Sequence, residues 1–151
     1  MSDDDFGGLH RLVAARLGEA GQLYTGNRRR LIELLADAGP STLPELLTAG
    51  DGLAQSSAYR NLTILAEVGV VRRLVHGGDH ARWELAEELT GHHHHLVCDL
   101  CGTVVDVELP VEVESLMDRA FDAVAAAAGF EVDHHNVDIL GRCADCRVTG
   151  N

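Results

Sequence analysis

The chain has 151 residues, 46% of them hydrophobic, and a formal net charge of −12 at pH 7. This length allows one ordinary domain or two small ones with a packed core. No run of about 18 apolar residues is present, and the N-terminus lacks the basic and apolar regions of a signal peptide, so we expect a cytoplasmic protein with reduced cysteines and no membrane partner.

The acidic charge is concentrated in the second half of the chain. Residues 1–75 carry 8 basic and 9 acidic residues, a net charge of −1, whereas residues 76–151 carry 4 basic and 15 acidic residues, a net charge of −11. Every basic residue is arginine, which suits bidentate contacts with phosphate and guanine. The asymmetry predicts two domains with different partners.

The first half begins with a series of short helices. Apolar residues recur with a helical period over residues 9–21, and a second periodic segment covers residues 25–39. A short third helix follows, with Ser41 or Thr42 as its N-cap.

A fourth helix and a β-hairpin complete this half. The fourth helix has Ser56 or Ser57 as its N-cap and ends at Gly69. The alternating runs "VVRRLVHG" and "ARWELAE" then flank a Gly-Gly turn, which is a hairpin signal. Three or four short helices followed by a hairpin predict a winged helix-turn-helix domain over residues 1–84.

The second half changes its hydrophobic period. Its expected elements are strands over residues 93–98, 103–109 and 130–141 and an alanine-rich helix over residues 111–129. Residues 85–91 are the expected hinge, and residues 92–151 are expected to form a small α/β domain. The predicted fold class is α+β.

Four cysteines form two Cys-x-x-Cys pairs, Cys98 with Cys101 and Cys143 with Cys146, and 41 residues separate the inner two. Two such pairs can place four thiolates tetrahedrally around zinc and tie distant strands together. Disulfides or a redox dithiol are the alternative, which a reducing compartment disfavours. The pattern predicts a closed, structural zinc site.

Four consecutive histidines, His92 to His95, precede the first cysteine pair. On a strand His93 and His95 share one face, whereas His92 and His94 share the other. The run therefore predicts two metal sites, each completed by other donors, although any one of these histidines could instead be solvated or pair with an acidic neighbour. Candidate donors elsewhere are Glu84, Asp106, Glu108, Glu112, Glu114, His134 and His135.

Three stretches carry the most specific pattern: "SSAYRNLTILAEVGVV", "RWELAEELTGHHHHLVCDLCG" and "HHNVDILGRCADC". In order, spacing and chemistry they resemble the ferric uptake regulator family of metal-sensing repressors, and the resemblance extends from about Leu9 to Arg147. It implies a homodimer that binds a palindromic double-stranded DNA operator when a regulatory metal, with Fe(II) the leading candidate, is bound.

The resemblance also implies roles for individual residues. The expected DNA-binding residues are Ser57, Tyr59 and Arg60. The expected sensing ligands are Glu84, His93 and His95. The expected ligands of an additional metal site are His92, His94, His135 and Glu114, with Glu112 as the alternative carboxylate. The four cysteines fall on the structural zinc ligands.

The sequence departs from the family pattern at the sensing site. The family often takes a histidine ligand from the DNA-binding domain, but the aligned residue here is Ser41, which leaves His76 or His80 as candidate substitutes. No cysteine remains beyond the structural four, and a site of nitrogen and oxygen donors suits Fe(II), Mn(II) or Ni(II), although zinc would also bind it. Glu84, where peroxide-sensing members typically have aspartate, argues against peroxide sensing.

A metalloenzyme that uses the histidine cluster and a glutamate base is the alternative from another class. The sequence lacks a His-Glu-x-x-His motif, a nucleophile motif and any sign of a pocket for a small-molecule substrate. We therefore expect a regulator and not an enzyme.

Overall fold

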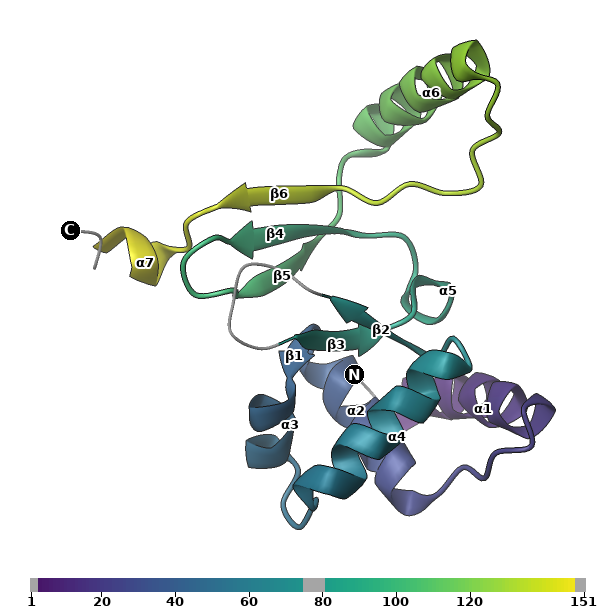
Figure 1. The fold of residues 1–151 in the computed structure, drawn as a ribbon, viewed down its shortest axis with the longest axis vertical. Coiled ribbons are helices and arrows are strands. Elements are labelled where there is room, and N and C mark those ends of the chain that lie inside the picture. Colours follow the sequence, from purple (N-terminus) through teal and green to yellow (C-terminus); the bar gives the residue numbers. More distant parts are fainter. Residues whose placement is uncertain (1–2, 75–80, 149–151) are drawn as a thin grey trace.

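The computed structural model describes residues 3–74 and 81–148, which form two parts with a three-stranded sheet each (Figure 1). The winged-helix part contains, in chain order, α1 (Asp3–Glu19), α2 (Gly26–Ala38), β1 (Ser41–Thr42), α3 (Leu43–Ala49), α4 (Gln55–Glu67), β2 (Val71–Leu74) and β3 (Arg82–Leu85). Its strand order is β1-β3-β2, with antiparallel pairing. The predicted helices followed by a hairpin, and the α+β class, are confirmed.

The core of the winged-helix part is built from aliphatic side chains of all four helices. The fully buried ones include Val13 and Leu17 of α1, Leu31, Ile32 and Leu35 of α2, Leu46 of α3, and Leu62 and Leu65 of α4. Burying one such side chain contributes about 1.5–3 kcal/mol. This packing fixes one face of α4 and leaves its opposite face to solvent.

The cap predicted at Ser41 or Thr42 is present in the structure, and Thr25 supplies another that the sequence analysis did not assign. The Thr25 hydroxyl accepts a hydrogen bond from the Arg28 amide at the start of α2. At the start of α3, Thr42 and Glu45 form a reciprocal capping box, in which each side chain accepts from the other residue's amide. Ser41, the other candidate for this cap, is buried in β1.

The predicted cap of α4 is wrong. The helix begins at Gln55 with Ala54 as its N-cap, and no side chain caps it. The Ser57 hydroxyl lies inside the helix and accepts hydrogen bonds from the side-chain amides of Asn27 and Asn61, each at 3.4 Å. One contact with α2 and one within α4 therefore use the hydroxyl that the sequence pattern offered as a cap.

The C-terminal part holds the second sheet. Its elements are α5 (Glu87–Thr90), β4 (His94–Cys98), β5 (Val104–Val107), α6 (Val111–Ala128), β6 (Asp138–Gly141) and α7 (Ala144–Val148). The central strand β4 pairs antiparallel with β5 and parallel with β6. One strand therefore joins a local hairpin to a segment about forty residues further along the chain.

The third strand of this sheet is shorter than predicted. Only Asp138–Gly141 pairs with β4, whereas the sequence predicts a strand over residues 130–141. In the preceding segment His135 turns toward α6, where its Nδ1 atom lies 3.3 Å from an Asp118 carboxylate oxygen. The segment rejoins β4 just before the strand, where the Val137 carbonyl accepts from the His95 amide at 3.2 Å.

Helix α6 projects away from both sheets (Figure 1) and has no buried residue within the single chain. Its exposed apolar residues, with those of β6 and the segment between them, are Val111, Val113, Leu116, Phe121, Val124, Phe130, Ile139 and Leu140. No helix within the described residues is both long and apolar enough to span a membrane.

Candidate metal centres and DNA-contacting helix

The four cysteines converge at one end of the C-terminal part, in what we call the cysteine site. The sulfur atoms all lie within 4.8 Å of one another, and they belong to Cys98, Cys101, Cys143 and Cys146. All four are free thiols, and the Cys101 and Cys143 sulfurs are 3.7 Å apart. This separation is too long for a disulfide bond but matches the distance of about 3.8 Å between thiolates held tetrahedrally by zinc at about 2.3 Å.

The proton affinities of these thiols are strongly unequal. Hydrogen bonds from backbone amides, with that of Cys143 the strongest, lower the pKa of Cys98 to about 6. In contrast, hydrogen bonding to the neighbouring Cys143 and Cys101 sulfurs raises the pKa of Cys146 to about 12. Four thiols this close cannot all ionise unless a cation balances their charge. The donor set therefore fits zinc.

The backbone around the cysteine site is tightly turned. Cys98 ends β4, Cys101 lies in the turn to β5, Cys143 follows β6 and Cys146 lies in α7. The amide of Gly102 donates to the carbonyl of Cys98 at 2.9 Å, which closes the first Cys-x-x-Cys turn. A metal here would join the β4–β5 turn to the end of the chain.

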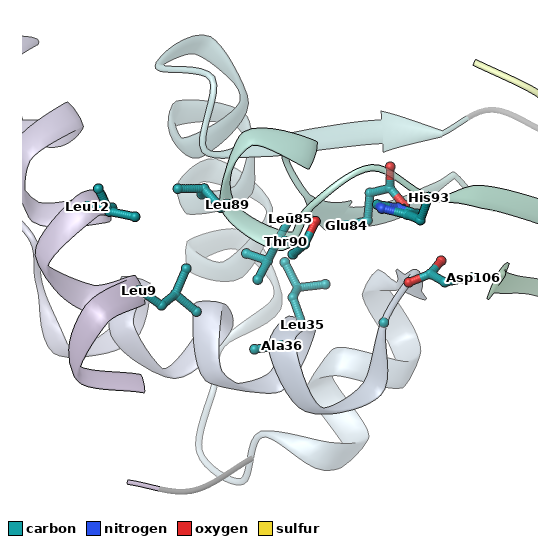
Figure 2. Close-up of a pocket in the computed structure, with 11 residues that line it drawn as sticks. Leu9, Leu12, Leu35, Ala36, Glu84, Leu85, Leu89, Thr90, His93 and Asp106 are labelled. Carbon is teal, nitrogen blue, oxygen red and sulfur yellow. The ribbon is translucent and has the colours of Figure 1, made fainter. Parts of the chain in front are cut away.

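A second cluster, which we call the junction cluster, lies where the two parts meet. It consists of Glu84, His93, His95 and Asp106, whose donor atoms lie within 4.8 Å of one another. The Glu84 Oε2 atom is 2.9 Å from His95 Nε2 and 3.6 Å from His93 Nε2. Figure 2 shows Glu84, His93 and Asp106 together at one end of a pocket of about 440 Å³.

Two neighbours orient the junction cluster. Arg72 of β2 donates from Nε and Nη2 to the Oε1 atom of Glu84, at 2.9 and 2.5 Å, which leaves Oε2 facing the histidines. On the other side, the Nδ1 atom of His95 lies 3.0 Å from an Asp138 carboxylate oxygen, which fixes the imidazole ring.

The electrostatics of this cluster favour a charged pair. Burial alone would raise the pKa of Glu84, but its hydrogen bond to His95 and the charges of His95 and Arg72 outweigh burial and lower that pKa. The hydrogen bond to Glu84 raises the pKa of His95; burial opposes this effect, and the contact with Asp138 reinforces it. A bound divalent cation would replace the proton on His95.

The junction cluster fits a divalent metal. Its carboxylates, Glu84 and Asp106, face two imidazoles, and burial raises the pKa of Asp106. The Nε2 atom of His93 is buried without a hydrogen-bond partner, a costly state that metal coordination would relieve. All four donors are nitrogen or oxygen, which suits Fe(II), Mn(II) or Ni(II).

The structure brings all three predicted sensing residues together and adds one residue to them. Asp106 joins the cluster because it pairs with His95 in the antiparallel register of β4 and β5. Ser41, aligned with the family's additional ligand, is outside the cluster, and its hydroxyl donates to the Gly39 carbonyl. The candidate substitutes, His76 and His80, lie outside the described residues.

A third cluster, the outer cluster, forms on the opposite face of β4. His92, His94, Glu114 and His135 have donor atoms within 4.8 Å of one another. His94 Nε2 is 2.8 Å from Glu114 Oε1, and the Nε2 atoms of His92 and His135 are each 3.5 Å from Glu114 Oε2. Glu114 Oε2 and His135 Nε2 are buried without a hydrogen-bond partner, so this donor set also fits a metal.

The histidine run therefore divides between two clusters as strand alternation predicts, although β4 itself begins only at His94. Of the two alternative carboxylates, the structure brings Glu114 and not Glu112 to the outer cluster. Within the described residues, Glu108 and His134 join no candidate metal cluster. That metals occupy these sites stays a prediction.

The exposed face of α4 carries the predicted DNA-contacting residues. Tyr59 is 51% exposed, and Arg60 is exposed beside it. The Tyr59 ring stands edge-on to Trp83 of β3, with ring centroids 6.2 Å apart, so the hairpin supports it. Ser57 is half-buried and bonded within the winged-helix part, as described above. A helix that presents Tyr and Arg in this way can enter the major groove.

Comparison with known proteins gives a consistent picture. The sequence profile of the Ferric uptake regulator family matches residues 19–140. The chain is 29% identical over 144 residues to the peroxide-responsive repressor PerR of Staphylococcus epidermidis, covering 91% of this chain and 89% of that protein. It is also 29% identical over 140 residues to the peroxide operon regulator of Bacillus subtilis, covering 89% and 91%.

Solved structures share the fold. The ferric uptake regulator of Helicobacter pylori, described with three functional metal-binding sites, superposes with a TM-score of 0.73 at 19% identity, covering 94% of this chain and 93% of that one. The Vibrio cholerae regulator gives 0.69 at 24% identity, covering 86% and 98%. A zinc-bound manganese uptake regulator gives 0.60 at 25% identity, covering 87% and 98%.

Proposed function

Because the chain belongs to the ferric uptake regulator family of metal-responsive repressors, we propose that it is a cytoplasmic homodimer that represses metal-homeostasis genes when Fe(II) is bound. In this proposal residues 1–84 form the DNA-binding domain, residues 85–91 the hinge and residues 92–151 the metal-binding dimerisation domain. The four cysteines hold structural zinc.

The observation that carries the proposal is the position of the junction cluster. Glu84 comes from β3 of the winged-helix part, whereas His93, His95 and Asp106 come from the C-terminal part. A metal bound by all four would hold the two parts at one angle. In a dimer, two DNA-binding domains held in this way would match the spacing of the half-sites in a palindromic operator. Without metal, the fraction of dimers able to bind the operator would fall.

The donor chemistry supports the choice of metal. Glu84, His93, His95 and Asp106 offer nitrogen and oxygen only, which suits Fe(II), Mn(II) or Ni(II), and Zn(II) would also bind; Fe(II) is the ion proposed because of the family. The outer cluster of His92, His94, Glu114 and His135 would bind an additional ion. Peroxide response is a second candidate function, because the two curated relatives named above are peroxide regulators.

The apolar surface of α6 and β6 supports a homodimer. Leu116 is 61% exposed, Val124 71% and Leu140 64% in the single chain. Exposing such side chains to water is unfavourable, and a second copy of the chain would bury them.

The proposal is tested by operator binding as a function of metal. Duplex DNA selected by the protein from a random pool would be titrated anaerobically in the presence of Fe(II), Mn(II), Ni(II) or Zn(II), at one salt concentration. We expect operator affinity to rise most with Fe(II) at cellular concentrations. Equal affinity with and without every metal would refute the proposal, and loss of binding after peroxide treatment of the Fe(II) form alone would favour peroxide response.

Substituting Tyr59 or Arg60 by alanine should weaken operator binding by about 1–3 kcal/mol without changing metal content. Both side chains lie on the exposed face of α4, and neither belongs to a metal cluster. Glu67→Ala, at the far end of the same helix, is the control and should leave binding intact. Wild-type operator affinity in both variants would mean that another element reads the groove.

Metal binding at the junction cluster should release protons. Because the pKa of His95 is raised above 6.5, its imidazole keeps a proton at a higher pH than a free histidine does. A metal must displace this proton, so metal affinity should fall as the pH drops through the raised pKa. Calorimetry in buffers of different ionisation enthalpy measures the protons released. Asp138→Asn removes one contact that raises this pKa, so this variant should release fewer protons; equal release would contradict the assignment.

A further inference from the structure

One arginine connects the DNA-binding helices to the cysteine site. Arg82 is the first residue of β3, and only 12% of its side chain is exposed. Its Nε atom donates to the carbonyl of Gly102 at 2.6 Å, and its Nη1 atom donates to the carbonyl of Pro40 at 3.0 Å. Its Nη1 and Nη2 atoms also contact the two carboxylate oxygens of Glu45, at 2.8 and 3.2 Å.

Within the winged-helix part, the partners of Arg82 lie at the ends of helices. Pro40 follows the end of α2, and Glu45 belongs to the capping box that starts α3. Burial would raise the pKa of Glu45, but hydrogen bonds from Thr42 and Arg82 outweigh it and lower that pKa, so the carboxylate stays charged opposite the guanidinium. Arg82 is therefore fixed to the helices that pack against α4.

The remaining partner, Gly102, belongs to the turn of the cysteine site. It follows Cys101 directly and adopts a φ of 69°, a left-handed conformation that glycine tolerates. Its amide bonds to the Cys98 carbonyl, and the hydroxyl of the next residue, Thr103, is 3.1 Å from the Cys101 sulfur. The direction of the Gly102 carbonyl thus depends on the conformation that the two thiols impose on this turn.

A cleft of about 350 Å³ lies between the two parts beside this contact, with Pro40, Glu45, Arg82 and Thr103 among its lining residues. The guanidinium of Arg82 links the two parts beside this cleft, at a place separate from the contacts of Arg72 with Asn136 and of Glu84 with His95. The contact requires several hydrogen bonds in a fixed planar arrangement, which arginine provides and lysine does not.

We propose that Arg82 is a positioning residue that transmits the conformation of the cysteine site to the DNA-binding helices. The cysteine site then helps to set the orientation of the DNA-binding domain on the operator. The link is separate from the junction cluster and acts whether or not a regulatory metal is bound. Its consequence for operator recognition rests on the proposed function, whereas the link itself does not.

The test compares full-length Arg82→Gln and Arg82→Lys proteins with wild type, all loaded with zinc and regulatory metal. Arg73→Gln is the matched control, because it removes an arginine from the neighbouring strand β2 that stacks over Trp83 and does not contact Gly102. Hydrogen exchange of residues 99–104 measures the link. The relative position of the two DNA-binding domains is measured by affinity for three DNAs. These are the duplex selected by the wild-type protein, the same duplex with its half-sites moved apart by one or two base pairs, and a single half-site.

We expect faster exchange of residues 99–104 in Arg82→Gln, with unchanged zinc content and unchanged affinity for regulatory metal. Its affinity for the full operator should fall about tenfold if one dimer in ten keeps the competent angle. It should also lose the preference for the native spacing while binding the single half-site as well as wild type does. Arg82→Lys should show the same pattern in weaker form, and it decides the outcome if Arg82→Gln loses zinc.

Wild-type exchange and wild-type spacing preference in both Arg82 variants would overturn the inference. So would an equal loss of spacing preference in Arg73→Gln, because the effect would then reflect charge alone. If the wild-type protein itself selects no DNA with any metal, the proposed function fails, and the exchange of residues 99–104 alone decides whether Arg82 links the two parts.

Discussion

Cys143→Ser is expected to lose about one zinc ion per chain and much of the protein's thermal stability, because structural zinc contributes about 10–16 kcal/mol of binding free energy to folding in small zinc domains. The Cys143 sulfur lies 3.7 Å from that of Cys101, and its amide bonds the Cys98 sulfur. A serine hydroxyl does not replace a thiolate ligand. Without zinc, β6 would keep its backbone pairing with β4 but lose the metal crosslink at its end, so α7 would lose its anchor and the proposed dimer surface of β6 would be less firmly held.

Zinc content after purification in reducing buffer and the melting temperature are the measurements. Ala144→Ser is the matched control, since it adds a hydroxyl at an exposed position of the same Cys-x-x-Cys loop and leaves all four thiols. The control should behave as wild type. Unchanged zinc content and melting temperature in Cys143→Ser would rule out a structural tetrathiolate site.

His93→Ala should give a folded, zinc-containing dimer that no longer gains operator affinity when metal is added. It removes a ligand of the junction cluster and leaves the outer cluster and the cysteine site intact. Removal of residues that merely support a ligand already weakens metal binding about 10–100-fold, so loss of the ligand itself should cost at least that much. Glu84→Ala should behave in the same way.

His92→Ala is the matched comparison, because it replaces the adjacent histidine, whose side chain belongs to the opposite face of the run. Its main effect should fall on dimer stability or on the metal concentration needed for binding. The readout is operator affinity across a metal titration. A wild-type response in His93→Ala would disprove the sensing role, and identical behaviour of the two variants in every assay would disprove the two-face division.

Local sequence patterns predicted the elements that depend on local rules. The helices, the hairpin and the division of the histidines follow from hydrophobic period and strand alternation, so they could be read from residues close together in the chain. Asp106 was only one of several candidate donors, because its selection depends on the register that pairs it with His95. That register could have been predicted by aligning the two strands across their turn.

Other features depend on contacts between distant segments and left no local signal. Ser57 fits an N-cap pattern, but its hydroxyl bonds Asn27 of the distant helix α2, in addition to Asn61 of its own helix. The segment before β6 contacts α6 through His135 and Asp118, and local strand patterning over residues 130–141 gives no sign of this contact. Arg72 and Arg82 are ordinary strand arginines in the sequence; the register of β2 and β3 places Arg72 opposite Glu84, whereas the packing of the two parts brings Gly102 to Arg82.

The strand β4 carries residues of all three clusters within five positions: His94 for the outer cluster, His95 for the junction cluster and Cys98 for the cysteine site. Neighbouring residues of one strand share a backbone, so an ion that fixes one imidazole restrains the other. Thermodynamic linkage makes this influence reciprocal, because the factor by which an ion in the outer cluster changes affinity at the junction cluster equals the factor in the opposite direction. With ions in both clusters, as proposed, the metal concentration at which the protein responds would be a joint property of the two ions.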